Sequence, residues 1–393
     1  MHILIAGAGI GGLTAALALL RRGIDVDVYE QAGELKEVGA GLQLSANGTR
    51  VFHLLGVGEA LRALSCEAAG KEVRLWGTGE TWKLFDLGAE SIARYGFPYF
   101  TVYRPDLLAL LVDAVRREKP DAIHLGMRCI GFDEDAGSVE LEFETGKSTG
   151  ADALVGADGV HSPIRQSLFG PDRPSFTGIV AWRGIVPMER LPARMARLIA
   201  TNWIGPGGHI VHYPLRGGRL MNFVGVLERS DWQVESWSTK GTRDEVLADF
   251  RGWHEDVQTL IRNIDTPYKW ALMVREPMPR WTRGRVTLLG DACHSMLPML
   301  AQGAVMAIED GYILARCLAE QDVETALVRY ERARRDRTRR AVEGSAANAT
   351  RFHNPQLADS VEAKQYVDRE WAEARIAERY EWLFRYDVTT VAI

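Results

Sequence analysis

The chain has 393 residues, which is enough for two or three domains or for one large unit with an inserted second layer. Its 46% hydrophobic and 25% charged residues are typical of a globular protein with a substantial core. The net charge of −5 excludes the strongly basic balance of nucleic-acid-binding proteins, so we expect no nucleic-acid partner. Cys66, Cys129, Cys293 and Cys317 form no CxxC pair, which argues against a metal site or a disulfide framework and favours a reducing cytosol.

An uncharged run near the start of the chain, residues 3–20, could pass for a signal peptide or a membrane span. A secretory signal needs positive charge before its apolar run, and only Met1 and His2 precede this one. The glycines of the run are clustered as a turn, so a buried strand, a tight turn and a buried helix explain it better. We therefore expect a cytoplasmic protein with no membrane span.

The first strand, helix and second strand are expected at residues 2–6, 13–22 and 25–30, which together form one βαβ unit. Gly23 is placed to end the helix at a C-cap. The same criteria predict helices at 47–55, 107–117, 244–262 and 301–320, a hairpin at 130–145, buried strands at 153–156 and 285–289, and a mainly helical tail from 324.

The middle of the chain is different, because residues 176–228 alternate between polar and apolar side chains and are rich in β-forming residues. This pattern predicts a separate antiparallel sheet. Its strands are expected at 179–186, 196–203, 210–214 and 220–227, with further short strands and turns at 73–100.

The first turn of the chain carries a glycine motif, Gly-Ala-Gly-Ile-Gly-Gly, at residues 7–12. Gly7 permits a tight turn, Gly9 permits close approach of a pyrophosphate, and Gly12 permits close packing of the helix on the strand. The helix N-terminus then offers its N–H groups and positive dipole to the phosphates. Glu30, 18 residues after Gly12, ends the second strand and is placed to accept hydrogen bonds from an adenosine ribose. The motif predicts an adenine dinucleotide and does not separate FAD from NAD.

Two later segments favour FAD over NAD, because they resemble motifs of a known family. The segment 156–165, Gly-Ala-Asp-Gly-Val-His-Ser-Pro-Ile-Arg, resembles the DG motif of the group A flavoprotein aromatic hydroxylases. The segment 289–298, which begins Leu-Gly-Asp-Ala-Cys-His and continues into residues 301–310, resembles their GD motif. The likeness extends through residues 180–184 and 384–387 and so covers nearly the whole chain. It implies that FAD is held permanently, whereas NADH or NADPH visits as a transient electron donor.

The resemblance also implies an α/β fold like that of para-hydroxybenzoate hydroxylase. We expect a Rossmann-like FAD-binding domain, an inserted antiparallel β-sheet substrate domain and a helical C-terminal tail. The FAD-binding domain is expected to be discontinuous. The predicted boundaries are 1–72, 101–175 and 268–325 for the FAD-binding domain, 73–100 and 176–267 for the substrate domain, and 326–393 for the helical region.

Individual flavin contacts follow from the same resemblance. Asp158 is expected to support the pyrophosphate region, and Asp291 to accept hydrogen bonds from the ribitol or from a nearby backbone turn. Arg104 resembles the flavin-contacting arginine of the family, and Arg50 is a weaker candidate. The Gly39-Ala40-Gly41 stretch is expected beside the isoalloxazine ring. The helix that begins near Gly303 and Ala304 is expected to direct its N-terminus at the pyrimidine ring of the flavin.

The predicted substrate site centres on the segment 208–215, Gly-His-Ile-Val-His-Tyr-Pro-Leu. On a strand His209 and Tyr213 share one face, whereas His212 lies on the other, where we expect a structural or solvent-facing role. A His and a Tyr facing one pocket are suited to hold a phenol and relay its proton, so both are candidate catalytic residues. The arrangement is similar to that of the 3-hydroxybenzoate 6-hydroxylase and 6-hydroxynicotinate 3-monooxygenase branch, near salicylate hydroxylase. A His and a Tyr that merely hydrogen-bond within the sheet are the alternative.

This chain departs from that branch at Gln43, where some members have a His that is able to take a proton. A carboxylate on the substrate calls for a cation, but Arg183, Arg216 and Arg219 are expected to be exposed. His294 is expected to pack or to cap a helix. The tail arginines are expected on a solvated helix and comprise Arg332, Arg334, Arg335, Arg337, Arg339 and Arg340.

The expected function is that of an FAD-dependent monooxygenase that uses NAD(P)H and O2 to hydroxylate an aromatic carboxylic acid of the salicylate or hydroxybenzoate type. The resemblance implies that the reaction proceeds through a C4a-hydroperoxyflavin, and we expect no metal ion. We expect a monomer or a homodimer. Two alternatives stay open: the same fold acting on hydroxynicotinate, urate, a polyketide or an alkene, and a non-catalytic flavin-binding protein.

Overall fold

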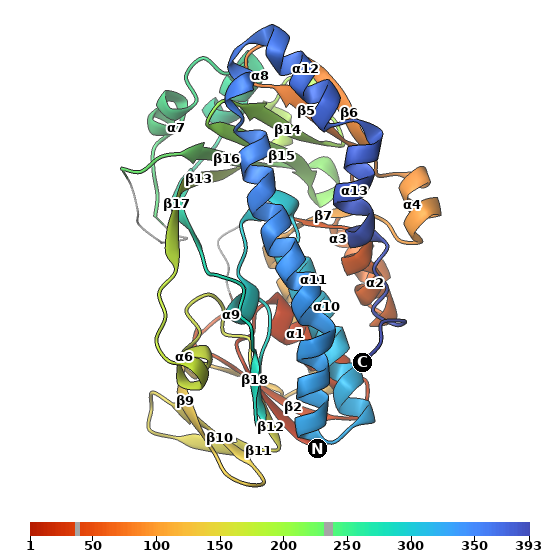
Figure 1. Cartoon of the computed structure of the whole chain (residues 1–393), viewed down its shortest axis with the longest axis vertical. Helices are drawn as coiled ribbons and strands as arrows, with labels where there is room; N and C mark the ends of the chain where they lie inside the picture. The colour runs from red at the N-terminus through yellow and green to blue at the C-terminus, as the bar shows by residue number, and fades with distance from the viewer. Residues whose placement is uncertain (36–39, 232–238) are drawn as a thin grey trace.

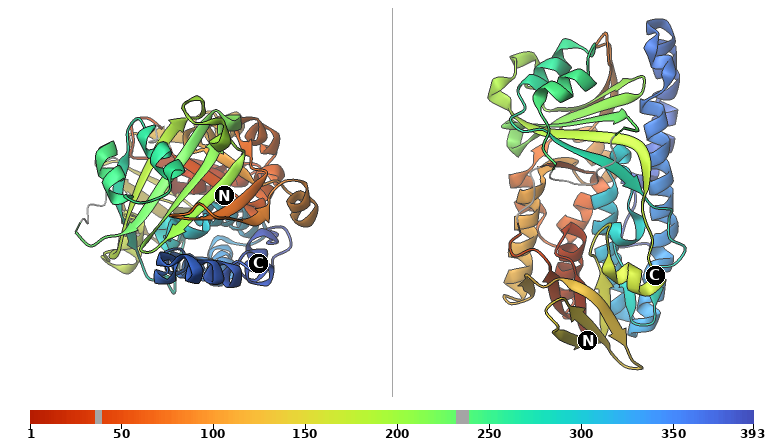
Figure 2. Two further views of the ribbon diagram at one scale, coloured as in Figure 1. Left: turned by 90° about the horizontal axis from the view of Figure 1, so that it is seen from above. Right: turned by 90° about the vertical axis from the view of Figure 1, so that its left-hand side faces the viewer.

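The computed structural model describes residues 1–35, 40–231 and 239–393. It has a six-stranded sheet at one end and a seven-stranded sheet at the other, and the long helix α11 (Val323–Phe352) runs alongside both (Figure 1; Figure 2, right). The expected combination of a Rossmann-like unit, a second sheet and a helical tail is therefore confirmed. Among the described residues, no helix is long and apolar enough to cross a membrane.

The six-stranded sheet has its first strand, β1 (His2–Ala6), between β2 and β12, and both pairs are parallel. Residues 3–6 are completely buried, which is why the strand reads as a continuous apolar run. Helix α1 (Ile10–Leu20) follows β1, and Gly23 adopts φ +74° just after the helix ends. The order of strands is β18 (Thr282–Arg283), β19 (Val286–Leu288), β12 (Ala153–Gly156), β1, β2 (Asp25–Glu30) and β8 (Ile123–Leu125).

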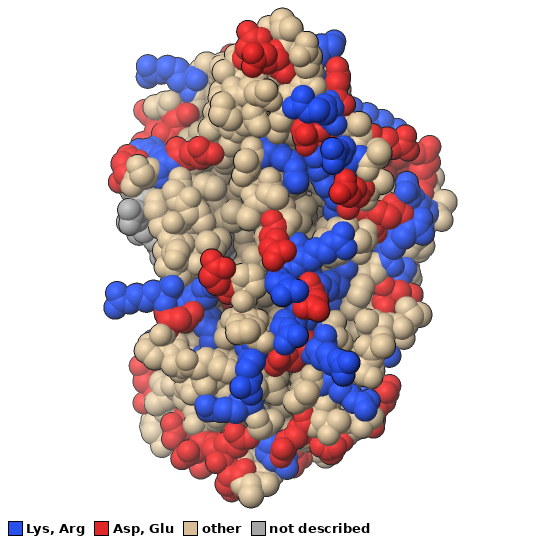
Figure 3. Space-filling view, in the orientation of Figure 1, with Lys and Arg blue, Asp and Glu red and all other residues tan. Residues whose placement is uncertain are grey.

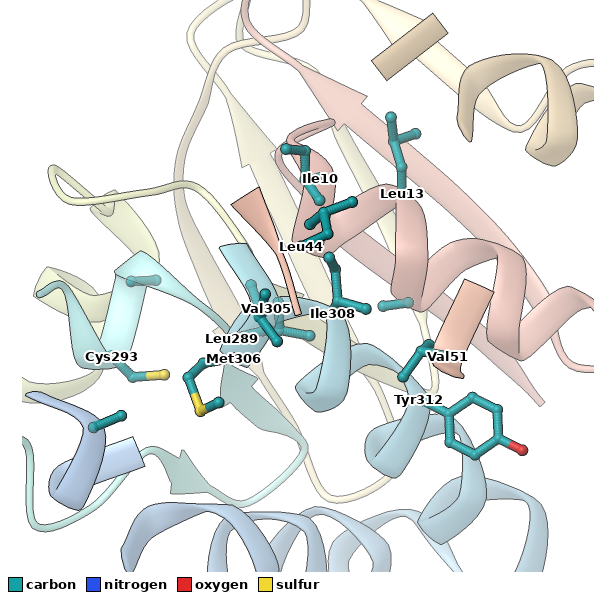
Figure 4. Close-up of a cluster of buried hydrophobic side chains, with 14 of the residues drawn as sticks. Ile10, Leu13, Leu44, Val51, Leu289, Cys293, Val305, Met306, Ile308 and Tyr312 are labelled. Carbon is teal, nitrogen blue, oxygen red and sulfur yellow. The ribbon is translucent and has the colours of Figure 1, made fainter. Parts of the chain in front are cut away.

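The core of this unit lies between α1 and α10 (Gly303–Glu320), as Figure 4 shows for Ile10, Leu13, Val305 and Ile308. The two helices approach so closely that a Cβ on Gly311 would lie 2.7 Å from the backbone N of Ala15. Further helices of the first half of the chain are α2 (Ala46–Leu54), α3 (Gly58–Leu64), α4 (Ala89–Tyr95), α5 (Arg104–Glu118) and α6 (Pro163–Phe169). Helix α4 lies where only strands and turns were predicted.

The seven-stranded sheet is antiparallel except for one pair, because β5 runs parallel to β14. Trp182 and Trp203, on one face of this sheet, form a second core with Phe250. The predicted helix at 244–262 is two helices, α7 (Arg243–Asp249) and α8 (Glu255–Arg262), with Gly252 at φ +83° between them. The order of strands is β17 (Tyr268–Val274), β13 (Ser175–Pro187), β16 (Leu220–Glu228), β15 (Gly208–Leu215), β14 (Ile199–Gly205), β5 (Gly70–Leu75) and β6 (Thr81–Asp86).

The remaining strands form two small sheets. One has the order β11 (Ser148–Ala151), β10 (Val139–Phe143) and β9 (Cys129–Glu134), and it contains the predicted hairpin. The other has the order β3 (Gly41–Leu44), β7 (Phe100–Tyr103) and β4 (Cys66–Glu67). Strand β7 lies close to β15, so this small sheet packs beside the seven-stranded sheet.

The C-terminal region is helical as expected, with α12 (Ser360–Glu370) and α13 (Glu373–Phe384) after α11. The expectation that its arginines are only a solvated face is wrong for two of them. Arg334 is completely buried and lies 2.7 Å from carboxylate oxygens of both Glu309 and Asp310. Arg337 is nearly buried and binds Glu309 with two hydrogen bonds. On the face that Figure 3 shows, basic side chains lie among acidic ones.

Candidate cofactor and substrate site

The glycine turn has the geometry that its three roles require. Gly7 has φ +106°, and a Cβ there would lie 2.4 Å from the carbonyl oxygen of Ala157. A Cβ on Gly12 would lie 2.1 Å from the carbonyl oxygen of Gly7, so this position serves close packing. A Cβ on Gly9 would meet no described atom within 4 Å. Packing therefore explains Gly7 and Gly12, whereas the open space beside Gly9 suits a ligand.

The start of α1 faces the same space. Within the described chain no side chain caps this helix, so its first N–H groups are available to a phosphate. The Glu30 carboxylate accepts hydrogen bonds from the backbone N–H groups of Ala8 at 3.0 Å and Ala32 at 2.9 Å. These bonds hold Glu30 against the glycine turn, where a ribose beside the pyrophosphate would meet it.

The DG segment is joined to the GD segment by Arg165, which sequence reasoning did not single out. Arg165 is 1% exposed and donates to the carbonyls of Ala292 at 3.0 Å and Val160 at 2.9 Å. Asp158 accepts from the backbone N–H of Ile164 at 3.1 Å, while its Oδ1 has no hydrogen-bond partner among the described atoms. Burial raises the pKa of Asp158. This buried oxygen is an acceptor that a cofactor hydroxyl could satisfy.

The GD segment leaves Asp291 at the surface, at the first position of α9 (Asp291–His294). His294, three residues on, is buried, and its Nε2 lies 2.6 Å from Asp310 Oδ2. The same carboxylate accepts from the backbone N–H of Gly290 at 3.2 Å. His294 therefore holds the turn in place, as expected, and leaves Asp291 accessible.

Helix α10 begins at Gly303 with Ala304 in its first turn, and within the described chain no side chain caps it. The preceding Gln302 donates to Ser45 Oγ at 2.9 Å, and Asn47 donates to Gln302 Oε1 at 3.2 Å. Ala301 adopts φ +55°, an uncommon backbone conformation for a residue with a Cβ. The loop is thus fixed so that the uncapped end of α10 lies beside β3.

The two arginines expected near the flavin differ in their surroundings. The backbone N–H of Arg104 donates to Ala40 at 2.9 Å, which places this residue beside the Gly41 strand. Arg50 lies 2.9 Å from Asp387 and donates to the carbonyl of Tyr386, so it holds the C-terminal segment. Gly39 lies outside the described residues.

Gly41 brings the predicted cofactor and substrate regions together. Its backbone N–H donates to Asn222 Oδ1 at 2.8 Å. A Cβ at this position would lie 2.6 Å from Cε2 of Tyr213 and 2.8 Å from Cγ of Asn222. Only a glycine lets the strand that follows the expected flavin loop pack this closely on β15 and β16.

His209 and Tyr213 lie on β15 and share one face, as the period of a strand predicts. His209 Nδ1 lies 2.7 Å from His353 Nε2, and His353 Nδ1 lies 3.0 Å from Glu228 Oε1. Burial and the neighbouring His353 lower the pKa of His209 well below its usual value, so its imidazole is neutral. Burial raises the pKa of the Tyr213 phenol.

Three other side chains on or beside this sheet are more buried than the sequence pattern predicts. His212 is buried on the opposite face, where burial lowers its pKa to about 3, so a solvent-facing position is wrong and a structural role stands. Arg183 is also buried, over the ring of Trp270, which corrects the expectation that it is exposed. Arg216 is half-exposed and bound twice to Asp106 at 2.7 Å, and Arg219 is exposed as expected.

Sequence reasoning missed Lys71, which lies on β5 close to Gln43. Its Nζ donates to Gln43 Oε1 at 3.5 Å, and the Tyr99 hydroxyl donates to the same oxygen at 2.9 Å. Burial lowers the pKa of Lys71 to about 8. A lysine in a short alternating strand carries no sequence signal of burial, because its neighbours come from β3 and β14.

A cofactor turn, two motif loops and a strand bearing a His and a Tyr define a flavoprotein oxygenase. The model of the family described as FAD binding domain matches residues 1–345. The 3-amino-4-hydroxybenzoate 2-monooxygenase of Streptomyces platensis is 38% identical over 99% of this chain and 97% of its own. The 6-hydroxynicotinate 3-monooxygenase of Pseudomonas fluorescens is 35% identical over 100% and 96%.

Solved structures agree with these relatives. Klebsiella pneumoniae HpxO, complexed with FAD and uric acid, superposes with a TM-score of 0.84 and 30% identity over 96% of each chain. The chain belongs to the FAD binding domain family. It is an FAD-dependent aromatic monooxygenase, and NAD(P)H is the electron donor typical of its family.

Proposed function

We propose that this enzyme hydroxylates a six-membered aromatic ring that bears both a hydroxyl group and a carboxylate, of the salicylate or hydroxybenzoate type. The observation that carries the proposal is the pairing of His209 and Tyr213 on the sheet face that packs against Gly41. Both relatives described above act on a hydroxylated aromatic acid according to their names, which supports the same substrate class here.

The residues proposed to hold FAD range from the glycine turn to the start of α10. The open space at Gly9, the uncapped helix ends and the unpaired Asp158 oxygen fit a dinucleotide with a polar ring. Bound FAD supplies a ring that NAD(P)H reduces and that then reacts with O2. The proposed contacts are Gly7, Gly9, Gly12, Glu30, Gly41, Arg104, Asp158, Asp291, Gly303 and Ala304.

His209 is proposed to take the proton of the substrate hydroxyl. Its imidazole is neutral, so Nε2 can accept a proton while Nδ1 stays paired with His353. Tyr213, whose phenol stays protonated, is proposed to position the same hydroxyl by a hydrogen bond. Loss of the proton makes the ring electron-rich at the positions ortho and para to the oxygen, which favours attack on an activated oxygen atom.

The test is to follow NAD(P)H oxidation and product mass with salicylate, 3-hydroxybenzoate, 4-hydroxybenzoate, 3-amino-4-hydroxybenzoate and 6-hydroxynicotinate. We expect one acid to gain one oxygen atom. His209→Asn is expected to lower that rate about 100-fold or more with FAD content unchanged, because a general base is lost. His124→Asn, on β8 of the other sheet, is the control and should keep the rate. The proposal fails if no acid on the panel is hydroxylated.

Urate is the second candidate substrate, because the HpxO structure superposes so well and is complexed with uric acid. Urate carries no carboxylate, so including it in the same assay separates the two candidates. The domain boundaries given above, a cytoplasmic location and a monomer or homodimer are retained as parts of the proposal.

A further inference from the structure

Lys71 lies on the same face of the seven-stranded sheet as Tyr213. It pairs with Ala200 of β14. In the next pair of strands Thr201 lies opposite His212, so Ala200 and Tyr213 share the other face. Ala200 and Tyr213 also belong to one buried cluster. Because Ala200 is small, β14 contributes only a methyl group between the Lys71 and Tyr213 side chains.

The Lys71 ammonium has no carboxylate partner among the described residues. The side chain is 9% exposed, and its hydrogen bond is to the neutral amide of Gln43 at 3.5 Å. The adjacent Glu72 points to the opposite face and binds Arg197 at 2.9 Å. A buried cation without a counter-ion is costly, so an anion that reached this point would be bound strongly.

The neighbours of Lys71 indicate which anion this is. His209 is close enough for the positive charge of Lys71 to act on it, and Tyr99 and Gln43 add polar groups from the side of β3 and β7. A hydroxylated aromatic acid has its negatively charged carboxylate at one position of the ring and its hydroxyl at another. The sheet face likewise presents a cation on β5 and a proton acceptor on β15.

We propose that the Lys71 ammonium binds the carboxylate of the aromatic substrate, an inference that rests on the proposed function. With the carboxylate held at β5, the ring lies across Ala200 and its hydroxyl is directed toward His209 and Tyr213. Lys71 then selects acids over neutral analogues and limits which ring position faces the flavin. Arg183, Arg216 and Arg219 are then not needed to bind the carboxylate.

The experiment titrates the FAD-containing enzyme with 3-hydroxybenzoate and with the neutral 3-hydroxybenzamide, followed by the change in flavin absorbance. The variants are Lys71→Met, Lys71→Arg and the control Lys83→Met, an exposed lysine on the neighbouring strand β6. Lys71→Met is expected to weaken binding of the acid about 100-fold and of the amide less than about threefold, because only the acid loses a buried ion pair. Lys71→Arg should keep most of the preference for the acid, and Lys83→Met should keep all of it.

If Lys71→Met binds the acid as tightly as the wild type does, or weakens acid and amide equally, the lysine does not bind the carboxylate. A changed flavin midpoint potential in substrate-free Lys71→Met would place the lysine at the flavin instead and overturn the inference. If the wild-type enzyme hydroxylates an acid but Lys71→Met keeps the acid-over-amide preference, only this inference fails. If the wild type hydroxylates no acid, the proposed function itself fails.

Discussion

The Lys71 ammonium destabilises the substrate-free protein at neutral pH, because burial removes its water and no carboxylate replaces it. Its pKa falls from 10.5 to about 8 on folding, which corresponds to about 3 kcal/mol. The unfolded chain binds the proton more tightly, so the cost is fully present below pH 8 and disappears as the pH rises toward 10.5. A residue that reduces stability in this way is typical of a binding site.

Lys71→Met is therefore expected to raise the free energy of unfolding by up to about 3 kcal/mol at pH 7. The gain should shrink between pH 8 and pH 10, because the wild-type lysine loses its proton there. Urea unfolding of the FAD-containing protein at several pH values, at one FAD concentration, measures both effects. Lys83→Met provides the comparison for an exposed lysine and should change stability by less than about 0.5 kcal/mol. A gain that is equal at pH 7 and pH 10 would mean that charge burial is not the cause.

Within one element, the glycine turn at the start of α1, one glycine leaves room for a ligand and another allows close packing. Gly9→Ala places a Cβ where no described atom lies within 4 Å, so the fold should be kept. The same Cβ would stand where the pyrophosphate approaches, so we expect FAD affinity to fall at least about tenfold. Gly12→Ala would place its Cβ 2.1 Å from a backbone oxygen and should destabilise the fold by about 1–3 kcal/mol.

Bound FAD per protein, thermal unfolding and far-UV circular dichroism of the two variants test this contrast. Gly9→Ala should purify with less FAD and an unchanged circular dichroism spectrum, and Gly12→Ala should unfold at a lower temperature. If Gly9→Ala retains FAD as tightly as the wild type does, the cofactor does not approach the turn at that position.

The elements that the sequence predicts well are those with a local cause. The first βαβ unit, the strands of the second sheet and α10 follow from periodicity and from glycine turns, and their observed bounds differ from the predicted ones by a few residues. The same-face placement of His209 and Tyr213 also needs only the period of a strand. The two-helix break at Gly252 was missed, because periodicity continues on both sides of one residue.

The features that sequence reasoning missed depend on partners far away in the chain. Arg334 is buried because Glu309 and Asp310 of α10 receive it, although its arginine-rich neighbourhood reads as a solvated surface. The parallel pairing of β5 with β14 decides which face Lys71 occupies, and no local pattern contains that register. No local pattern marks His353, because its contact with His209 forms only where α11 ends beside β15.

At the scale of the whole molecule, α11 runs alongside both large sheets (Figure 1). Near its middle, Arg334 and Arg337 hold the carboxylates of α10, the helix whose start is proposed to meet the flavin. At its C-terminal end, His353 meets His209 on the second sheet. One helix therefore contacts both α10, which packs in the unit of the six-stranded sheet, and β15 of the seven-stranded sheet.

The same arrangement makes the pH dependence of the reaction sensitive to the C-terminal helix. His209 has to be neutral to accept a proton, and burial, His353 and Lys71 all lower its pKa. The rate should therefore stay high as the pH falls through 6.5, and the acid limb of kcat/KM should lie below that value. His353→Asn removes one of the repelling charges but keeps a polar partner, so we expect the acid limb to move to higher pH.

The measurement is kcat/KM for the best acid between pH 5 and pH 9, with the wild type, His353→Asn and Glu228→Gln. Burial lowers the pKa of His353 and Glu228 opposes that effect, so Glu228→Gln should leave His353 less often charged and move the acid limb of the reaction in the same direction as His353→Asn does, to higher pH. Tyr213 and Tyr99 stay protonated throughout this range, because burial raises the pKa of both. Displacements to higher pH in both variants would tie the limb to His209, whereas a limb that neither variant moves would exclude His209 as the base.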